Sequence, residues 1–108
     1  MIVMKNYLAV HTFIDDERKA QFFEVAPHMG TDDVLMKSDN ANAMQSWISK
    51  DEDFFFCHWI AKDEDDILQV LEERGYEKSF QTVCYEMPGF ISRYTGKLDV
   101  PEIAKQLG

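Results

Sequence analysis

Four side chains that could together bind a transition metal are spread over three segments of the chain. They are His11, His58, Cys84 and Glu86. Imidazole, thiolate and carboxylate groups are common protein ligands of zinc and of other transition metals such as nickel. These residues form no sequential motif such as H-E-x-x-H, so a shared site requires the fold to bring them together.

The segments that carry these residues have the composition of β-strands. Residues 7–14, 43–49, 54–61 and 82–87 are rich in aromatic and β-branched side chains or alternate in polarity, as strands do. The apolar run at 54–61 lies between two acidic turns, which is typical of a strand covered on both faces. We expect a hairpin between 43–49 and 54–61, with Trp47 opposite Phe56 and Met44 opposite Trp59.

Two helices are expected between these strands. Asp15 or Asp16 can cap a first helix, which Pro27 should end because its ring cannot continue the hydrogen-bond ladder. Asp63 can cap a second helix, in which apolar residues recur with helical spacing until Gly75 stops it.

The order of these elements, βαββαβ, predicts an α+β fold of the ferredoxin-like sandwich type. Its four-stranded antiparallel sheet should carry two helices on one face, with the first and third strands central and the fourth beside the first. A short C-terminal helix is expected from about Asp99 or Pro101. We interpret residues 1–108 as one domain, with a core of about 7–90 and a C-terminal extension of 91–108.

Alternation along each strand assigns side chains to one sheet face or the other. The face toward the helices is expected to hold Leu8, Val10, Met44, Ile48, Phe55, Trp59, Val83 and Tyr85. The open face is then expected to hold the four candidate metal ligands, with Phe13, Gln45, Trp47 and Phe56 as ligand-binding residues. Neighbouring strands lie about 4.8 Å apart, so side chains from three strands can reach one ion.

The same residues also allow a structural interpretation. His11 and His58 could be hydrogen-bonded side chains at an interface, and Cys84 a small apolar residue. Cys57 is predicted to be a core thiol on the face opposite Cys84, so the two should not pair. The acidic clusters at 51–53 and 63–66 lack the glycine and final glutamate of a calcium loop, and we interpret them as turns and helix caps.

Composition excludes several classes of partner. The chain has 20 acidic and 11 basic residues and a formal net charge of −9. That charge repels phosphate backbones and anionic lipids, so we expect neither nucleic acid nor a membrane as a partner. Two cysteines form no disulfide framework, and the sequence shows no signal peptide or membrane-spanning run. We therefore expect a cytoplasmic protein.

The segment from Trp47-Ile48-Ser49 through Phe56-Cys57-His58-Trp59-Ile60-Ala61, with the acidic helix start and Gly75, resembles a family of small bacterial ferredoxin-like proteins. That family is mostly of unknown function and includes a nickel-binding branch. The likeness covers residues 7 to 90, because the strand ending in His11-Thr12-Phe13 is similar to the family's opening. It implies the fold and a homodimer, and it favours nickel among the metals. The insertion at 27–42 and the chain after Phe90 lie outside it.

Two main functional hypotheses follow. The first is a non-enzymatic homodimer that binds nickel, zinc or a small ligand at the open sheet face, a face too aromatic to be left in water. The second is a cofactor-independent monooxygenase or isomerase that uses the same cavity, with His58 or His11 transferring protons between walls formed by Trp47 and Phe56. A structural or regulatory dimer without a ligand is a third alternative. The sequence favours a protein that is not an enzyme.

Overall fold

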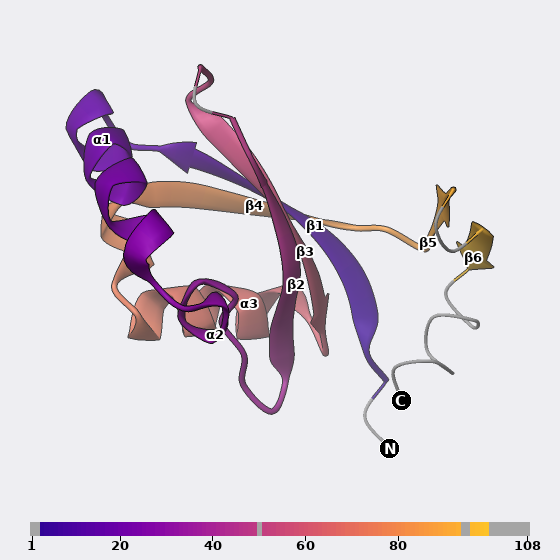
Figure 1. Ribbon diagram of the computed structural model, residues 1–108. Helices are drawn as coiled ribbons and strands as arrows, with labels where there is room; N and C mark the ends of the chain where they lie inside the picture. Colours follow the sequence, from indigo (N-terminus) through magenta and orange to yellow (C-terminus); the bar gives the residue numbers. More distant parts are fainter. Residues whose placement is uncertain (1–2, 50, 94–95, 100–108) are drawn as a thin grey trace.

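The computed structural model describes residues 3–49, 51–93 and 96–99. Its main body is an α+β unit, and a separate two-stranded hairpin follows it (Figure 1). The strands and helices are β1 (Lys5–Phe13), α1 (Asp16–Val25), α2 (Thr31–Val34), β2 (Ala41–Ile48), β3 (Phe54–Ala61), α3 (Glu64–Glu73), β4 (Phe80–Glu86), β5 (Gly89–Ser92) and β6 (Gly96–Asp99). Among the described residues, no helix is long and apolar enough to cross a membrane.

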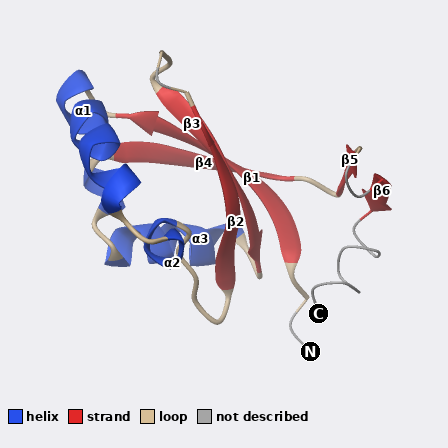
Figure 2. Cartoon of the chain, viewed as in Figure 1, coloured by secondary structure: helices blue, strands red, loops and turns tan. Residues whose placement is uncertain are grey.

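The main sheet has the strand order β2-β3-β1-β4, and all its neighbouring strands are antiparallel. β1 and β3 are therefore central and β4 lies beside β1, which confirms the predicted order. The helices lie on one side of this sheet, away from the β5–β6 hairpin (Figure 2). This arrangement is compatible with a ferredoxin-like fold and leaves one sheet face without helices, which we call the open face.

The β2–β3 hairpin confirms most of the expected register. Gln45 pairs with His58, and Trp47 pairs with Phe56. The pairing of Met44 with Trp59 was wrong, because the register shifts between Ala43 and Gln45 and Ala43 takes the place opposite Trp59. A bulge of this kind adds one residue to one strand, and apolar alternation alone does not reveal it.

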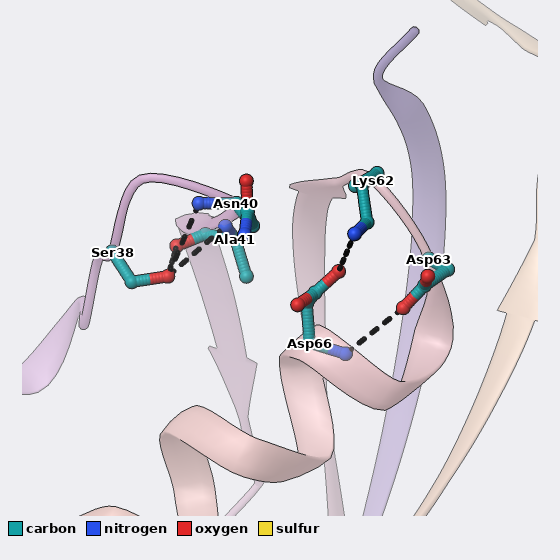
Figure 3. A network of polar contacts seen from close by, with 6 residues as sticks. All are labelled: Ser38, Asn40, Ala41, Lys62, Asp63 and Asp66. Carbon is teal, nitrogen blue, oxygen red and sulfur yellow. Dashed lines mark hydrogen bonds and ion pairs between the residues drawn. The ribbon is translucent and has the colours of Figure 1, made fainter. Parts of the chain in front are cut away.

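Capping side chains begin the two longer helices as the sequence predicts. The Asp15 carboxylate accepts a hydrogen bond from the Arg18 backbone N–H at 2.7 Å, and that of Asp63 accepts one from Asp66 at 3.1 Å (Figure 3). Each bond satisfies one of the backbone donors that a helix start leaves without an internal partner. Gly75 then follows α3 with a φ of 76°, a left-handed conformation that glycine adopts without steric cost,.

The side chains of β1 and β4 point to the opposite sheet faces from those expected. Leu8 and Val10 of β1 lie on the open face, because Ala9 pairs with Cys57 and His11 with Phe55, and β3 buries those two partners. A shift of one residue moves a whole strand's side chains to the other face. β1 is apolar on both faces, so its pattern could not decide the assignment. The side chains that β1 and β4 bury on the helix-covered face are Tyr7, Ala9, His11, Phe13, Phe80 and Cys84.

An aromatic cluster forms the centre of this helix-covered core. The Phe55 ring lies 5.3 Å from that of Phe13, 5.2 Å from that of Phe22 and 5.2 Å from that of Phe80, measured between centroids. Buried aromatic pairs at such separations contribute about 0.5–1.5 kcal/mol each beyond their apolar area. The cluster joins α1 to the middle of the sheet and holds β1 in its observed orientation.

The end of the chain differs from the expected C-terminal helix. β5 and β6 pair as an antiparallel hairpin from Gly89 to Asp99, which the sequence reading did not anticipate. Asp99, a proposed helix start, ends β6. The remainder of the expected helix, at 100–108, lies outside the described residues.

Candidate functional site

The four expected metal ligands lie on different faces of the sheet. Cys84 pairs with Ala9 on the helix-covered face, which also holds His11, whereas His58 pairs with Leu8 on the open face. Glu86 is exposed at the end of β4, where its carboxylate lies 3.9 Å from the Lys5 ammonium. Among the described residues, no three His, Cys, Asp or Glu side chains are placed to hold a metal ion together.

His11 is a fully buried histidine with a structural environment. Its side chain is 1% exposed, and its Nδ1 lies 2.7 Å from the Thr82 hydroxyl oxygen. The rings of Phe55 and Phe80 flank the imidazole at 4.6 and 4.7 Å between centroids. Burial lowers the pKa of His11 to about 4, so the ring is neutral at pH 7,. Its contacts match the structural interpretation, although it lies in the core of the chain.

The two thiols correct a second expectation. Cys57 and Cys84 lie on the same sheet face, because both pair with Ala9 from opposite sides. A whole strand separates them, so they remain free thiols,. Burial raises the pKa of Cys57 to about 11 and that of Cys84 to about 12, and the Ser46 hydroxyl lies 3.0 Å from the Cys57 sulfur. Neither thiol supplies a thiolate at neutral pH.

The expected ligand-binding residues divide in the same way. Phe13 lies in the aromatic core, where it is 7% exposed, and does not face a ligand. Gln45, Trp47 and Phe56 do lie on the open face, in register with one another along β2 and β3. The hairpin was therefore oriented correctly from the sequence, and the assignments that failed are those on β1 and β4.

A hollow of about 670 Å³ lies on the open face beside His58. Its floor comes from β1 and β3, one wall from β2, and the other wall from Met87 and the strand β5. We call it the open-face hollow, and its lining residues are Asn6, Tyr7, Leu8, Gln45, Trp47, His58, Met87, Gly89, Ile91 and Ser92. Its volume falls within the range of about 300–1,000 Å³ that is typical of small-molecule sites.

A hydrogen bond between two lining side chains orients the imidazole of the open-face hollow. His58 Nε2 lies 2.8 Å from Asn6 Oδ1. A carbonyl oxygen only accepts, so the Nε2–H of His58 donates. Burial lowers the pKa of His58 below its ordinary value of 6.5, which keeps the ring neutral at pH 7,.

Asn6 is a polar lining residue that was not predicted from the sequence. It is 4% exposed, and the first strand begins at Lys5, two residues earlier than expected. The available signal was its spacing: Asn6 lies two residues before Leu8 and therefore shares the open face with it. A polar side chain buried beside a histidine is unusual enough to mark a site once the strand is extended.

Large apolar side chains at the open-face hollow and elsewhere on the open face remain exposed in the chain. Trp47 is 48% exposed, Tyr85 51% and Ile91 78%. With Phe54, Val83 and Met87 they form what we call the open-face patch. Contiguous exposed patches of this kind are typical of interfaces or binding grooves. The open face therefore combines an apolar surround with two hydrogen-bonded polar side chains, and it offers no thiolate and no charged lining group among the described residues.

Comparison of the chain with protein-family models, with curated proteins and with solved structures found no match. The resemblance to small bacterial ferredoxin-like proteins therefore stays a prediction.

Proposed function

We propose that this chain is a small ferredoxin-like binding protein, and not an enzyme, that takes a small organic ligand in the open-face hollow and works as a homodimer. The observation that carries the proposal is the hollow itself, which the His58–Asn6 pair and Trp47 both line. Pockets with mostly apolar walls and a few fixed polar groups are the usual form of small-molecule sites. The buried free thiols Cys57 and Cys84 fit a cytoplasmic protein,.

An organic ligand is preferred to nickel or zinc because of how the candidate ligands are distributed. His58 is the only one of the four expected ligands that lines the open-face hollow. His11 and Cys84 lie across the sheet from it, and the high pKa of Cys84 works against metal coordination as thiolate,. Binding of nickel or zinc that is lost in His58→Ala, measured by calorimetry on protein without a histidine tag, would overturn this preference.

The homodimer is proposed from the open-face patch. Three of its members, Phe54, Val83 and Tyr85, are exposed on strands of the main sheet outside the hollow. A second copy of the chain, related by a two-fold axis, can cover this surface with the same residues. We expect a dimer in sedimentation equilibrium, and we expect Tyr85→Lys to weaken it at least tenfold. Leu68→Lys, which changes an exposed apolar side chain on α3, is the matched control; equal weakening by both, or a native monomer, would contradict the dimer.

A catalytic role would depend on the same imidazole. His58 is neutral at pH 7 and could accept a proton, which is the observation that favours an isomerase or a cofactor-independent monooxygenase,. The described lining of the hollow, however, contains no carboxylate, amine or thiol to act with it. Proton-transfer chemistry commonly uses two such groups with separated pKa values. Binding without catalysis is therefore the function that the hollow supports better.

Nile red, an uncharged dye whose emission rises in apolar surroundings, tests the binding site without knowledge of the natural ligand. We expect the native protein to increase its emission, and we expect Trp47→Ala to weaken dye binding about tenfold because one wall is removed. Trp47 is half exposed, so the variant should still fold, which circular dichroism can verify.

Thr12→Ala provides the matched control for this measurement. Thr12 is exposed on the open face, but it pairs with Phe54 and Gln81 at the end of the sheet away from the hollow. Dye binding should be unchanged in this variant. Absence of dye binding, or equal loss in Thr12→Ala and Trp47→Ala, would overturn the proposed site.

A further inference from the structure

The ligand class can be inferred from the charges that the open-face hollow lacks. None of the ten lining residues that the structure describes carries a formal charge at pH 7, because the only titratable groups among them are the imidazole of His58, which burial keeps neutral, and the phenol of Tyr7, whose pKa is raised. Moving a charged group out of water without a partner is unfavourable. An ion that entered the hollow would lose part of its hydration and gain no counter-charge from the described lining residues.

The field of the whole chain adds a second reason against anions. The formal net charge of −9 repels carboxylates and phosphates before they reach any site,. That field favours cations, but tight recognition of an organic cation uses carboxylates or several aromatic rings. Among the described lining side chains, Trp47 is the one indole or phenyl ring whose strand position faces the hollow.

The polar groups of the hollow are neutral and lie side by side. Gln45 pairs with His58 across β2 and β3, and the His58 ring is hydrogen-bonded to Asn6. An amide both donates and accepts hydrogen bonds. Gln45 is exposed, so its amide can turn to meet either a hydroxyl or a carbonyl group on a ligand.

The apolar groups of the hollow favour a flat molecule. Leu8 lies on the sheet floor beside His58, its pairing partner, and the exposed indole of Trp47 stands on the neighbouring strand. Aromatic rings prefer offset stacking on an indole face. Met87 and Ile91 close the opposite side with apolar side chains, and the flexible thioether chain of Met87 adapts to rings of different outline.

We propose that the open-face hollow selects an uncharged, flat aromatic molecule that carries one hydroxyl or carbonyl group, and that it discriminates against both anionic and cationic analogues. This inference rests on the proposed function, since it names the ligand class of the same hollow. The hydrogen-bonding group would meet Gln45 and the His58–Asn6 pair, and the ring would lie against Trp47.

Three naphthalene probes of equal ring size test the inference by displacing Nile red from the full chain at pH 7. 2-Naphthol is uncharged, 2-naphthoate is an anion, and 2-naphthylmethylamine is a cation. We expect 2-naphthol to displace the dye at a concentration about tenfold lower than either charged probe. A charged probe that displaces the dye more readily than 2-naphthol would overturn the inference, while dye binding itself would leave the proposed site intact.

Gln45→Glu and Gln45→Lys place one charge of either sign in the hollow and form a matched pair. The first should make the amine the strongest competitor, and the second should do the same for the carboxylate. Both changes are at an exposed position, so folding should be retained. If the order of the three probes is the same in both variants as in the native protein, the probes bind elsewhere and the inference is wrong.

Discussion

The two histidines of the sheet lie in opposite environments. His11 is held on the helix-covered face by Thr82 and two phenyl rings, and it is not among the described residues that line the open-face hollow. His58 lies on the open face, is hydrogen-bonded to Asn6, and lines the hollow. Burial keeps both rings neutral at pH 7. A lowered histidine pKa therefore does not by itself distinguish the two rings, whereas His58 lines the open-face hollow and His11 does not,.

The largest difference in stability between the two faces is expected for alanine substitutions at two adjacent residues of β3. Phe55 is 4% exposed in the aromatic core, whereas Phe56 is only half-buried on the open face. We predict that Phe55→Ala lowers the free energy of unfolding by about 3–5 kcal/mol, because it leaves a cavity that the core cannot fill. Phe56→Ala should cost about 1 kcal/mol or less.

Chemical denaturation of the two phenylalanine variants measures this difference. Equal losses of stability would mean that the open face is as well packed as the core, which a second subunit could produce. Repeating the measurement over a range of protein concentrations separates these cases, because dimer stability depends on concentration.

The second prediction concerns pH and distinguishes the two histidines. The pKa of His11 falls from an ordinary 6.5 to about 4 on folding, so the folded chain binds fewer protons than the unfolded chain between these values,. With respect to His11, the free energy of unfolding should therefore be at its full value above pH 6.5 and fall by about 3 kcal/mol as the pH drops toward 4. His11→Gln should remove most of this slope, measured by urea unfolding at several pH values.

His58→Gln is the control for the pH prediction. Burial also lowers the pKa of His58. The His58→Gln variant should therefore also reduce the pH slope of the free energy of unfolding, but by less than His11→Gln does. A larger reduction in the His58 variant would contradict the assignment of His11 as the deeply buried ring.

A smaller effect is expected from the hydroxyl partner of His11. Thr82→Val keeps the side-chain shape and removes the oxygen that lies 2.7 Å from Nδ1. Leaving a buried ring nitrogen without its partner should cost about 1–3 kcal/mol of stability. Binding of Nile red should not change, because Thr82 lies on the helix-covered face. A loss of dye binding without a loss of stability would mean that the two faces are coupled.

The sequence predicted the parts of the fold that local chemistry determines. Asp15 and Asp63 cap helices because short carboxylates accept backbone hydrogen bonds, and Gly75 ends α3 because it adopts a left-handed conformation,. The strand order followed from the element order. These features depend on a few neighbouring residues, so they can be predicted from the sequence.

The faces of β1 and β4 could not be predicted by the same reasoning. Tyr7, Ala9 and Phe13 are as apolar as Leu8 and Val10, so alternation on β1 fits either orientation. What decides it is long-range packing: Phe13 and His11 fit against the rings of Phe55 and Phe80. The expected metal cluster depended on the predicted faces of β1 and β4. Because both strands present the opposite faces, His11 and Cys84 lie across the sheet from His58,.

The candidate site was predicted in part. Gln45, Trp47 and His58 line the hollow, as predicted, and the β2–β3 pairing places Gln45 opposite His58. Met87, Ile91 and Ser92 were not foreseen, because Pro88 and Gly89 read as the end of the last strand and gave no sign of a further hairpin. The wall that this hairpin adds is a feature of tertiary structure.

Proton–nitrogen NMR of the two tryptophan side chains and of the two histidine side chains of the sheet, during addition of 2-naphthol, tests the central claim most directly. Each face contributes one of each: Trp47 and His58 on the open face, and Trp59 and His11 in the core. We predict that the Trp47 and His58 signals move together and saturate, while those of Trp59 and His11 stay in place. Movement of the Trp59 and His11 signals without the other two would contradict the account.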